Sequence, residues 1–319
     1  TSIPMRRLLL CLCALIAALA SPAAEPTVKI TRDLSFLAPN RAEKLDLYQP
    51  ATPPPAGQRT PGIVWIHGGG WTGGEKGEAR GTEVCTTLAT AGYVAVSINY
   101  KLGDNSWPQN ILDCKNAVRW LRAHAAEYHI DPDRIAVAGG SAGGHLSLMV
   151  GYTTGKKEFE PEDLYPGVSS AVRCIVNMYG ITDLVTKDQV DAKGAPTATR
   201  VLMAKSLKAF NVATDGDDGL RLASPLTYAT KNVPPTLTFH GHDDAIVDYP
   251  QTEKLAAKLT ALGAVHEEVF LDGVGHLDLA RALDTSDSLD GGVQEVVETG
   301  HWVSVCRAGA RLARCPQPR

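Results

Sequence analysis

A serine, an acidic pair and a histidine occur in this chain where each could take part in nucleophilic catalysis. Ser141 lies within Gly139–Gly143, Asp243 and Asp244 follow a short apolar run, and His276 stands in a glycine-containing loop. A serine hydroxyl is a poor nucleophile near neutral pH, so it needs a base, a carboxylate that orients the base, and oxyanion donors. The order serine, aspartate, histidine is that of a triad whose serine lies in a Gly-x-Ser-x-Gly turn. These residues are therefore candidates for a Ser-His-Asp triad, with the choice of aspartate open.

The serine-containing turn has the flanks that its chemistry requires. An apolar run, Ile135–Ala138, leads into it, and an alanine- and leucine-containing segment follows, which predicts a strand, a tight turn and a helix. Glycines two residues before and two residues after Ser141 let strand and helix approach without Cβ clashes. By itself the pattern also fits an ordinary glycine-rich loop, so the case for Ser141 rests on its partners.

A second glycine run begins at Gly68, directly after an apolar stretch that predicts a buried strand. Missing Cβ atoms allow backbone N–H groups to approach a developing negative charge, so we predict Gly68, Gly69 and Ala142 as oxyanion donors. The alternative is a phosphate-binding loop, but no Lys-Ser/Thr pair follows. Trp71, at the end of this run, is a candidate for lining a substrate pocket, and plain packing is its alternative.

The histidine and acidic candidates also have simpler interpretations. His276 could be an ordinary loop histidine, but its place after the last predicted strand favours the role of base. The aspartate that does not join the triad would be a solvated loop carboxylate. His240 and His242 beside the two aspartates resemble a metal site, yet no further ligand cluster is evident in the sequence. We therefore predict neither a metal nor a cofactor.

The elements that must position these residues alternate between strand and helix. We predict strands at 28–37, 44–48, 62–66, 93–100, 135–138, 172–178, 236–239 and 267–271, and helices at 79–91, 108–128, 198–210 and 252–262. This alternation predicts an α/β fold with a mostly parallel eight-stranded sheet and helices on both faces. Ligands of such sheets bind at the carboxyl ends of the strands, where the candidate residues lie.

Length and composition are those of an ordinary globular protein. The chain has 319 residues, 44% hydrophobic and 21% charged, with a net charge of −4, which gives no reason to expect a nucleic-acid partner. We predict one catalytic domain over 25–319, in which the irregular segment 180–233 is a candidate for a small cap. The tail 277–319 is atypical, because it lacks a clear helical period beyond its first residues.

The first 24 residues have the composition of a secretory signal peptide. Met5-Arg6-Arg7 precede the apolar run Leu8–Ala20, and small residues follow it. Residues 1–4 stand before this methionine and are interpreted as non-native or upstream. The run is short for a membrane span, so we predict a secreted or periplasmic protein without stable membrane insertion after removal of the signal; an uncleaved anchor is the alternative.

Five cysteines follow the predicted signal peptide, and their odd number implies at least one free thiol in an exported chain. Cys85, Cys114 and Cys174 fall in predicted helices and a strand, where small buried thiols are expected. Cys306 and Cys315 could bridge at the tail. The spacing contains no Cys-x-x-Cys, so structural zinc is not expected.

Over about Leu45 to His276, the chain resembles bacterial α/β-hydrolase esterases related to hormone-sensitive lipase. The motifs that carry the resemblance are His67-Gly-Gly-Gly-Trp71, Tyr100, Ile111-Leu-Asp-Cys-Lys-Asn-Ala-Val-Arg-Trp-Leu-Arg122, Asp131-Pro-Asp-Arg-Ile135, Gly139-Gly-Ser-Ala-Gly-Gly-His145, Ser224-Pro225, Pro234-Pro-Thr-Leu and His240-Gly-x-x-Asp244. Within these esterases, the chain is most similar to the bifunctional feruloyl and acetyl xylan esterase group. The resemblance departs after His276, where that family has an amphipathic helix.

The resemblance implies the α/β-hydrolase fold and a serine carboxylesterase that works through an acyl-enzyme, on a small ester or on acetyl or feruloyl groups of plant polysaccharide. In the family's His-Gly-x-x-Asp pattern the final aspartate is the acid, which selects Asp244 over Asp243. A serine peptidase or arylamidase is a rival, because the same triad cleaves amides. A non-catalytic binding protein on the same scaffold is a second rival, although no triad member is missing.

Overall fold

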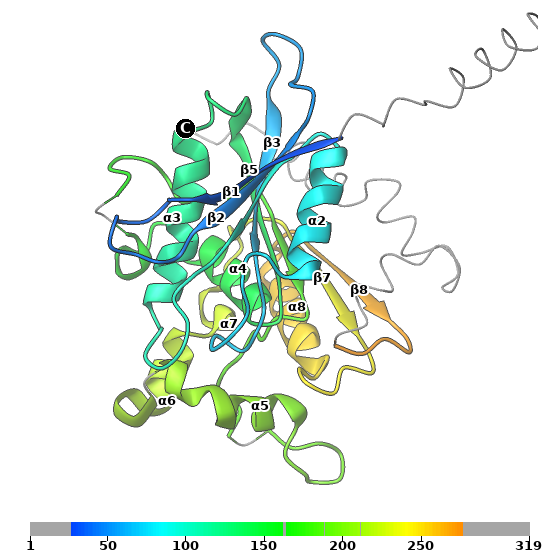
Figure 1. Ribbon diagram of the computed structural model, residues 1–319. Helices are drawn as coiled ribbons and strands as arrows, with labels where there is room; N and C mark the ends of the chain where they lie inside the picture. The colour runs from blue at the N-terminus through cyan, green and yellow to red at the C-terminus, as the bar shows by residue number, and fades with distance from the viewer. Residues whose placement is uncertain (1–26, 162–163, 188, 211, 277–319) are drawn as a thin grey trace, which may run out of the picture.

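The computed structural model describes residues 27–161, 164–187, 189–210 and 212–276 (Figure 1). The predicted signal peptide and the tail 277–319 lie outside these residues. Eight strands form one sheet in the order β1-β2-β4-β3-β5-β6-β7-β8. They are β1 (Val28–Leu34), β2 (Leu45–Pro50), β3 (Thr60–Ile66), β4 (Val94–Ile98), β5 (Ile130–Gly140), β6 (Ile175–Met178), β7 (Thr236–Gly241) and β8 (His266–Leu271).

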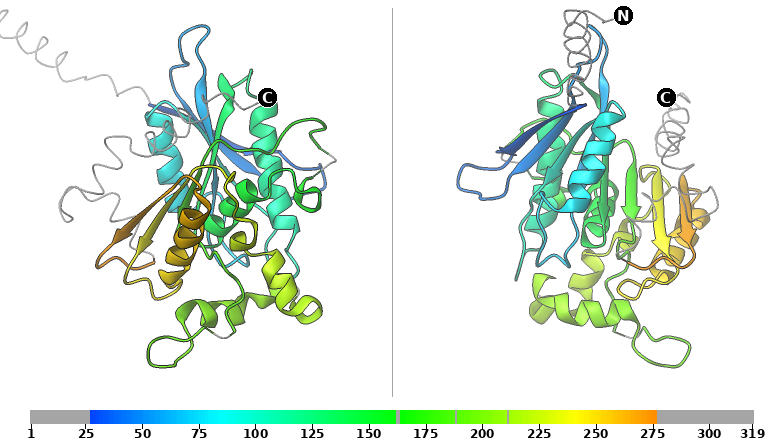
Figure 2. Two further views of the ribbon diagram at one scale, coloured as in Figure 1. Left: turned by 180° about the vertical axis from the view of Figure 1, so that it is seen from behind. Right: turned by 45° about the vertical axis from the view of Figure 1, so that its right-hand side comes forward.

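Two pairings in the sheet, β1 with β2 and β2 with β4, are antiparallel, and the remaining five are parallel. The helices are α2 (Ala79–Thr90), α3 (Gln109–Ala123), α4 (Ala142–Tyr152), α5 (Ala198–Ser206), α6 (Val212–Leu222), α7 (Pro225–Tyr228) and α8 (Pro250–Leu262), with short 3-10 turns η1 (Lys157–Phe159) and η2 (Leu207–Phe210). The predicted mostly parallel eight-stranded sheet with flanking helices is confirmed (Figures 1 and 2).

The side chains of β3 show how the sheet is buried on both faces. Val64 and Ile66 belong to one apolar cluster, with residues of α3 and α4, whereas Ile63 and Trp65 belong to a second, with residues of α2. Successive strand residues point to opposite faces, so these two clusters are the two cores of a three-layer arrangement. This double burial explains why the central strands are continuous apolar runs in the sequence.

The segment 180–233 leaves the sheet and carries α5, η2, α6 and α7. Helices α5 and α6 lie apart from the helices that flank the sheet, below it in the view of Figure 1. The sequence predicted a helix at 198–210 but neither α6 nor α7. Helix α6 contains Asp-Gly-Asp-Asp-Gly, whose residues have low helix propensity, and α7 has four residues, too few to show a period.

Two further expectations needed correction. Strand β5 begins at Ile130, before the predicted start at residue 135, and runs through Asp131-Pro132-Asp133, because Ile130 pairs with Thr60 across an irregular register. Cys85 and Cys114 are buried free thiols, as expected, but Cys174 is disulfide-bonded, so the prediction of a thiol there was wrong.

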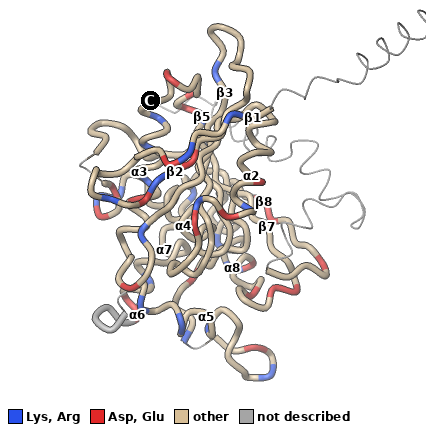
Figure 3. The backbone as a smooth tube through the Cα atoms, viewed as in Figure 1, with Lys and Arg blue, Asp and Glu red and all other residues tan. Residues whose placement is uncertain are grey.

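Positive and negative side chains are interspersed along the described chain rather than gathered by sign (Figure 3). Among the described residues, no helix combines the length and the apolar character needed to cross a bilayer.

Candidate active site

Ser141 occupies a strained turn between β5 and α4. Its backbone angles, φ 56° and ψ −120°, lie where L-residues are rare, and its N–H donates to the carbonyl of Met178 at 2.9 Å. A Cβ on Gly143 would lie 2.0 Å from the carbonyl oxygen of Ile66 on β3. Only glycine at position 143 lets the helix start this close to the neighbouring strand. The geometry is therefore that of the predicted nucleophile elbow.

The predicted acid and base meet beyond the carboxyl ends of β7 and β8. The Nδ1–H of His276 donates to Oδ2 of Asp244 over 2.7 Å, and both residues are less than 10% exposed. The other oxygen, Oδ1, accepts from the backbone N–H groups of Ile246 and Val247, at 2.9 and 2.8 Å. Asp243 is exposed. The structure thus brings Asp244, not Asp243, to the histidine.

The carboxylate of Asp244 stays ionised in this setting. Burial alone would raise its pKa, but hydrogen bonds from His240 and His276 outweigh that effect and hold the pKa well below its usual range. Because a carboxylate only accepts, Nδ1 of His276 must carry the proton of the neutral imidazole, which leaves Nε2 as the free lone pair. That tautomer is the one a general base requires.

Tyr179, which the sequence analysis did not single out, lies between the base and the elbow. Its ring centroid is 4.5 Å from that of His276, and its hydroxyl lies 2.9 Å from where a Cβ on Gly140 would stand. Arg80 donates to the same hydroxyl, and burial raises the pKa of Tyr179 to about 12. One phenol ring therefore spans from His276 to the residue before Ser141. Its place directly after β6, at a strand end, was the signal that could have found it.

The glycine loop after β3 reaches the elbow. A Cβ on Gly68 would lie 3.4 Å from the Cβ of Ser141 and 3.1 Å from the carbonyl oxygen of Gly140. Gly69 has φ 104°, and a Cβ there would be 2.2 Å from the carbonyl oxygen of Gly73, so this turn also requires glycine. Ala142, the third predicted donor, is the first residue of α4 and is buried. The structure places Gly68 against Ser141, and Ala142 follows Ser141 in the chain; the role of all three as oxyanion donors stays a prediction.

Two aromatic residues flank this loop. His67 is fully buried and stacks on Tyr100, with ring centroids 4.4 Å apart, and burial lowers its pKa to about 4. Its neutral ring donates from Nδ1 to the carbonyl of Gly68 at 2.7 Å. Trp71 has no exposed surface. Its predicted part in a substrate pocket stays a prediction, and its visible contacts are those of a packed residue.

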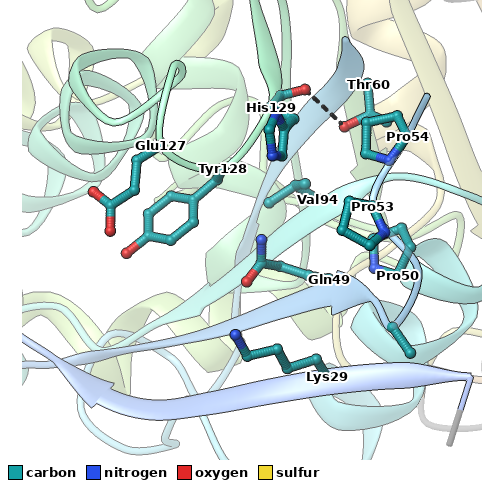
Figure 4. Close-up of a pocket in the computed structure, with 11 residues that line it drawn as sticks. Lys29, Gln49, Pro50, Pro53, Pro54, Thr60, Val94, Glu127, Tyr128 and His129 are labelled. Atoms are coloured by element: carbon teal, nitrogen blue, oxygen red, sulfur yellow. Dashed lines mark hydrogen bonds between the residues drawn. The ribbon is translucent and has the colours of Figure 1, made fainter. Parts of the chain in front are cut away.

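Two cavities lie at opposite edges of the sheet. One of about 340 Å³ is lined by Lys29, Gln49, Val94 and Tyr128 among others (Figure 4). It lies at the amino ends of β3 and β4, whereas Ser141 follows the carboxyl end of β5. The other, of about 700 Å³, is lined by Asp244, by neighbouring loop residues and by the segment 189–192. Only the second adjoins the candidate triad. Across the described ranges, no group of three or more His, Cys, Asp or Glu residues could hold a metal ion.

The segment 180–233 is fastened to the acid-bearing loop. The carboxylate of Asp248 accepts the backbone N–H groups of Ala198 and Thr199, at 3.1 and 2.7 Å, and so caps the first turn of α5. The hydroxyl of Thr199 in turn accepts the N–H of Asp248 at 2.9 Å. Helix α5 and the loop that carries Asp244 are therefore one connected unit.

Comparisons with known proteins agree with this geometry. The BD-FAE family model matches residues 45–259. The chain is 32% identical over 277 residues to the probable carboxylic ester hydrolase LipM of Mycobacterium tuberculosis (strain ATCC 25618 / H37Rv), covering 84% of this chain and 62% of that protein. The chain thus spans less than two thirds of this relative.

Solved structures share the fold. A truncated carbohydrate esterase from gut microbiota superposes with a TM-score of 0.69 at 23% identity, over 90% of this chain and 99% of that one. An acetyl ester-xyloside bifunctional hydrolase from Caldicellulosiruptor lactoaceticus gives a TM-score of 0.63 at 25% identity, over 84% of this chain and 90% of that one. These similarities establish the predicted α/β-hydrolase architecture.

Proposed function

Because the chain belongs to the BD-FAE family, we propose that it is a serine carboxylesterase that hydrolyses esters through an acyl-enzyme. The observation that carries the proposal is the 2.7 Å pair of His276 and Asp244, which Tyr179 connects to the strained elbow of Ser141. The name of the matching relative, a probable carboxylic ester hydrolase, supports it.

The arrangement supports a two-step mechanism. Ser141 Oγ attacks the ester carbonyl while Nε2 of His276 takes its proton, and the resulting imidazolium is stabilised by the ionised Asp244. The backbone N–H groups of Gly68, Gly69 and Ala142 would hold the oxyanion, where each donor is typically worth about 100- to 1000-fold in rate. His276 then returns the proton to the leaving alcohol, and water releases the acid from the serine by the same route.

For the substrate, we propose acyl esters on plant polysaccharide, with acetyl and feruloyl groups as the candidates. The structural neighbour named as an acetyl ester-xyloside hydrolase supports a carbohydrate-linked ester. Hydrolysis of acetylated xylan and methyl ferulate, compared with p-nitrophenyl esters of increasing chain length, tests this choice. A preference for long-chain p-nitrophenyl esters over both natural-type substrates would contradict it.

Export from the cell is the third part of the proposal. The charged residues, apolar run and small residues at the start of the sequence support a secreted or periplasmic location. Sequencing the amino terminus of the mature protein from culture medium or periplasm tests it. Mature protein that still carries Met5 would contradict removal of a signal.

The triad is tested by Ser141→Ala. This variant should retain its fold and its melting temperature, lose turnover of p-nitrophenyl acetate, and no longer react with a fluorophosphonate probe. Asp243→Asn, on the same loop as Asp244 but exposed, is the matched control and should keep full activity. Turnover that survives in Ser141→Ala would exclude this serine as the nucleophile, and a wild-type protein that the probe does not label would indicate a binding protein.

A further inference from the structure

The histidine that ends the nucleophile motif has no part in the triad, yet it is held between two other segments. His145, on α4 one turn after Ser141, is fully buried. Its Nδ1 lies 3.1 Å from the indole Nε1 of Trp71, and its Nε2 lies 2.7 Å from the carbonyl oxygen of Ala223. Trp71 follows the oxyanion glycines, and Ala223 follows α6 where the cap returns toward the sheet. One imidazole therefore joins the nucleophile helix, the glycine loop and the cap.

The partners fix the protonation state of His145. An indole N–H can only donate, so Nδ1 of His145 must be the acceptor, and a carbonyl can only accept, so Nε2 must carry the proton. An imidazolium would set two N–H groups against each other at Trp71. Burial acts in the same direction and lowers the pKa of His145 to about 4. With a neutral imidazole, His145 therefore makes both hydrogen bonds of the link, one with Trp71 and one with Ala223.

Aromatic side chains enclose this link. Phe210, from η2 of the cap, packs edge-on against Trp71 with ring centroids 4.8 Å apart, and edge-on against His145 at 6.1 Å. Trp107 contacts the same imidazole and the same phenylalanine. The cap is therefore in direct contact with the tryptophan that ends the oxyanion loop.

The backbone of Trp71 depends on such contacts. Its φ is 61°, a left-handed conformation that is costly for a bulky side chain and persists only where surrounding contacts enforce it. Its carbonyl accepts the N–H of Gly103 at 2.9 Å. A Cβ on the preceding Gly70 would lie 3.5 Å from the hydroxyl of Ser206 on α5. Releasing the indole would leave the strained turn free to relax, and the glycines next to it would move.

We propose that His145 and Trp71 are positioning residues that hold the glycine loop against Ser141 and tie its geometry to the cap. This inference rests on the proposed esterase function, because it assigns the glycine loop the role of oxyanion hole. Neither side chain touches the reacting atoms. Their effect is on the placement of the N–H groups of Gly68 and Gly69, which matters most when the carbonyl oxygen becomes charged.

Trp71→Phe tests the link with a small change, since it keeps an aromatic ring and removes the N–H that donates to His145. We expect kcat for p-nitrophenyl acetate to fall about 10- to 100-fold per active site, with KM changed less than about threefold, because the loss falls on the transition state. His145→Phe should give a similar loss. The double variant should keep about the same kcat as the less active of the two single variants, because both substitutions remove the same link.

The affinity for a trifluoromethyl ketone, whose adduct with serine carries an oxyanion, separates positioning from general damage. Across the variants its inhibition constant should rise in proportion to the loss of kcat/KM. Fluorophosphonate titration counts the competent sites, so partial unfolding lowers that count and not kcat per site. His145→Gln keeps one acceptor and one donor and should recover part of the activity that His145→Phe loses.

Trp120→Phe is the matched control, because Trp120 is also buried and stacks on a histidine, His124, at the far end of α3. It should keep kcat within about twofold. Unchanged kcat per titrated site in both Trp71→Phe and His145→Phe, or a rise in KM alone, would overturn the inference. Activity that survives in Ser141→Ala would instead overturn the esterase proposal, so the two failures are distinguishable.

Discussion

Acidification from pH 7 to pH 5 should remove much of the free energy of unfolding, because two buried imidazoles stay neutral in the fold. His67 and His145 have no exposed surface, and burial lowers the pKa of each from 6.5 to about 4. The unfolded chain binds these two protons near pH 6.5, whereas the folded protein binds them only near pH 4. Their contribution is therefore fully present above pH 6.5 and decreases as the pH falls through the window between these values.

The size of the effect follows from the two pKa values. A difference of roughly 2.5 units corresponds to about 3.4 kcal/mol for each imidazole in the acid limit, and about 2 kcal/mol of that is already lost at pH 5. Together the two imidazoles should reduce stability by about 4 kcal/mol between pH 7 and pH 5, a large share of the typical total of about 5–15 kcal/mol. Asp244, whose pKa is lowered from 3.8, loses its contribution only at lower pH.

Urea unfolding followed by circular dichroism at pH 7, 6 and 5 measures this loss. His145→Gln removes one of the two imidazoles, so its stability should depend on pH about half as steeply between pH 6.5 and pH 5. Trp71→Phe is the comparison: it leaves the imidazole buried but removes the indole N–H that opposes its protonation, so stability should fall at pH 7 and depend on pH less steeply than in the wild type but more steeply than in His145→Gln. A free energy of unfolding that is equal at pH 7 and pH 5 would refute the argument.

Two more substitutions test the triad loop and the elbow. Asp244→Asn should lower kcat about 10⁴-fold without loss of fold, because the amide N–H₂ would face Nδ1 of His276 and force the wrong tautomer; steady-state kinetics beside exposed Asp243→Asn, which should match wild type, checks this. Gly143→Ala should reduce the free energy of unfolding by about 3 kcal/mol or more, since its Cβ would lie 2.0 Å from a carbonyl oxygen of β3. In Gly77→Ala the new Cβ would meet no atom nearer than 3.9 Å, so the free energy of unfolding should change by less than about 1 kcal/mol. Urea titration of both variants measures the difference. Equal losses in the free energy of unfolding of the two alanine variants would show that the close approach of α4 to β3 does not require glycine at position 143.

The local sequence was enough to predict the strands of the sheet and the position of the elbow. The central strands are buried on both faces, so they are continuous apolar runs, and each is followed by a helix with its own period. The segment 180–233 was harder to predict, because helix α6 has a composition unfavourable to helices and owes its structure to contacts such as that of buried Leu220 with the rest of the core. A single-sequence pattern cannot supply such contacts.

The residues of the candidate site also divide into those that the sequence reveals and those that only the fold reveals. Ser141 and the two glycine runs are marked by backbone requirements, which restrict residue types at fixed spacing and are therefore visible in the chain. Tyr179 and His145 carry no such local restriction. Their importance arises from segments that are distant in sequence, since Tyr179 contacts His276 and His145 bonds to Ala223.

The sequence by itself therefore determined the succession of the eight strands, the tight turns and the set of residues able to do the chemistry, because these depend on local propensity and steric limits. Tertiary structure decided which carboxylate the imidazole meets. Asp243 and Asp244 are adjacent and chemically identical, and the choice depends on the turn after β7, which buries Asp244 beneath backbone donors and leaves Asp243 in solvent. The family resemblance anticipated that choice, but the reason for it is a contact between loops 32 residues apart in the chain.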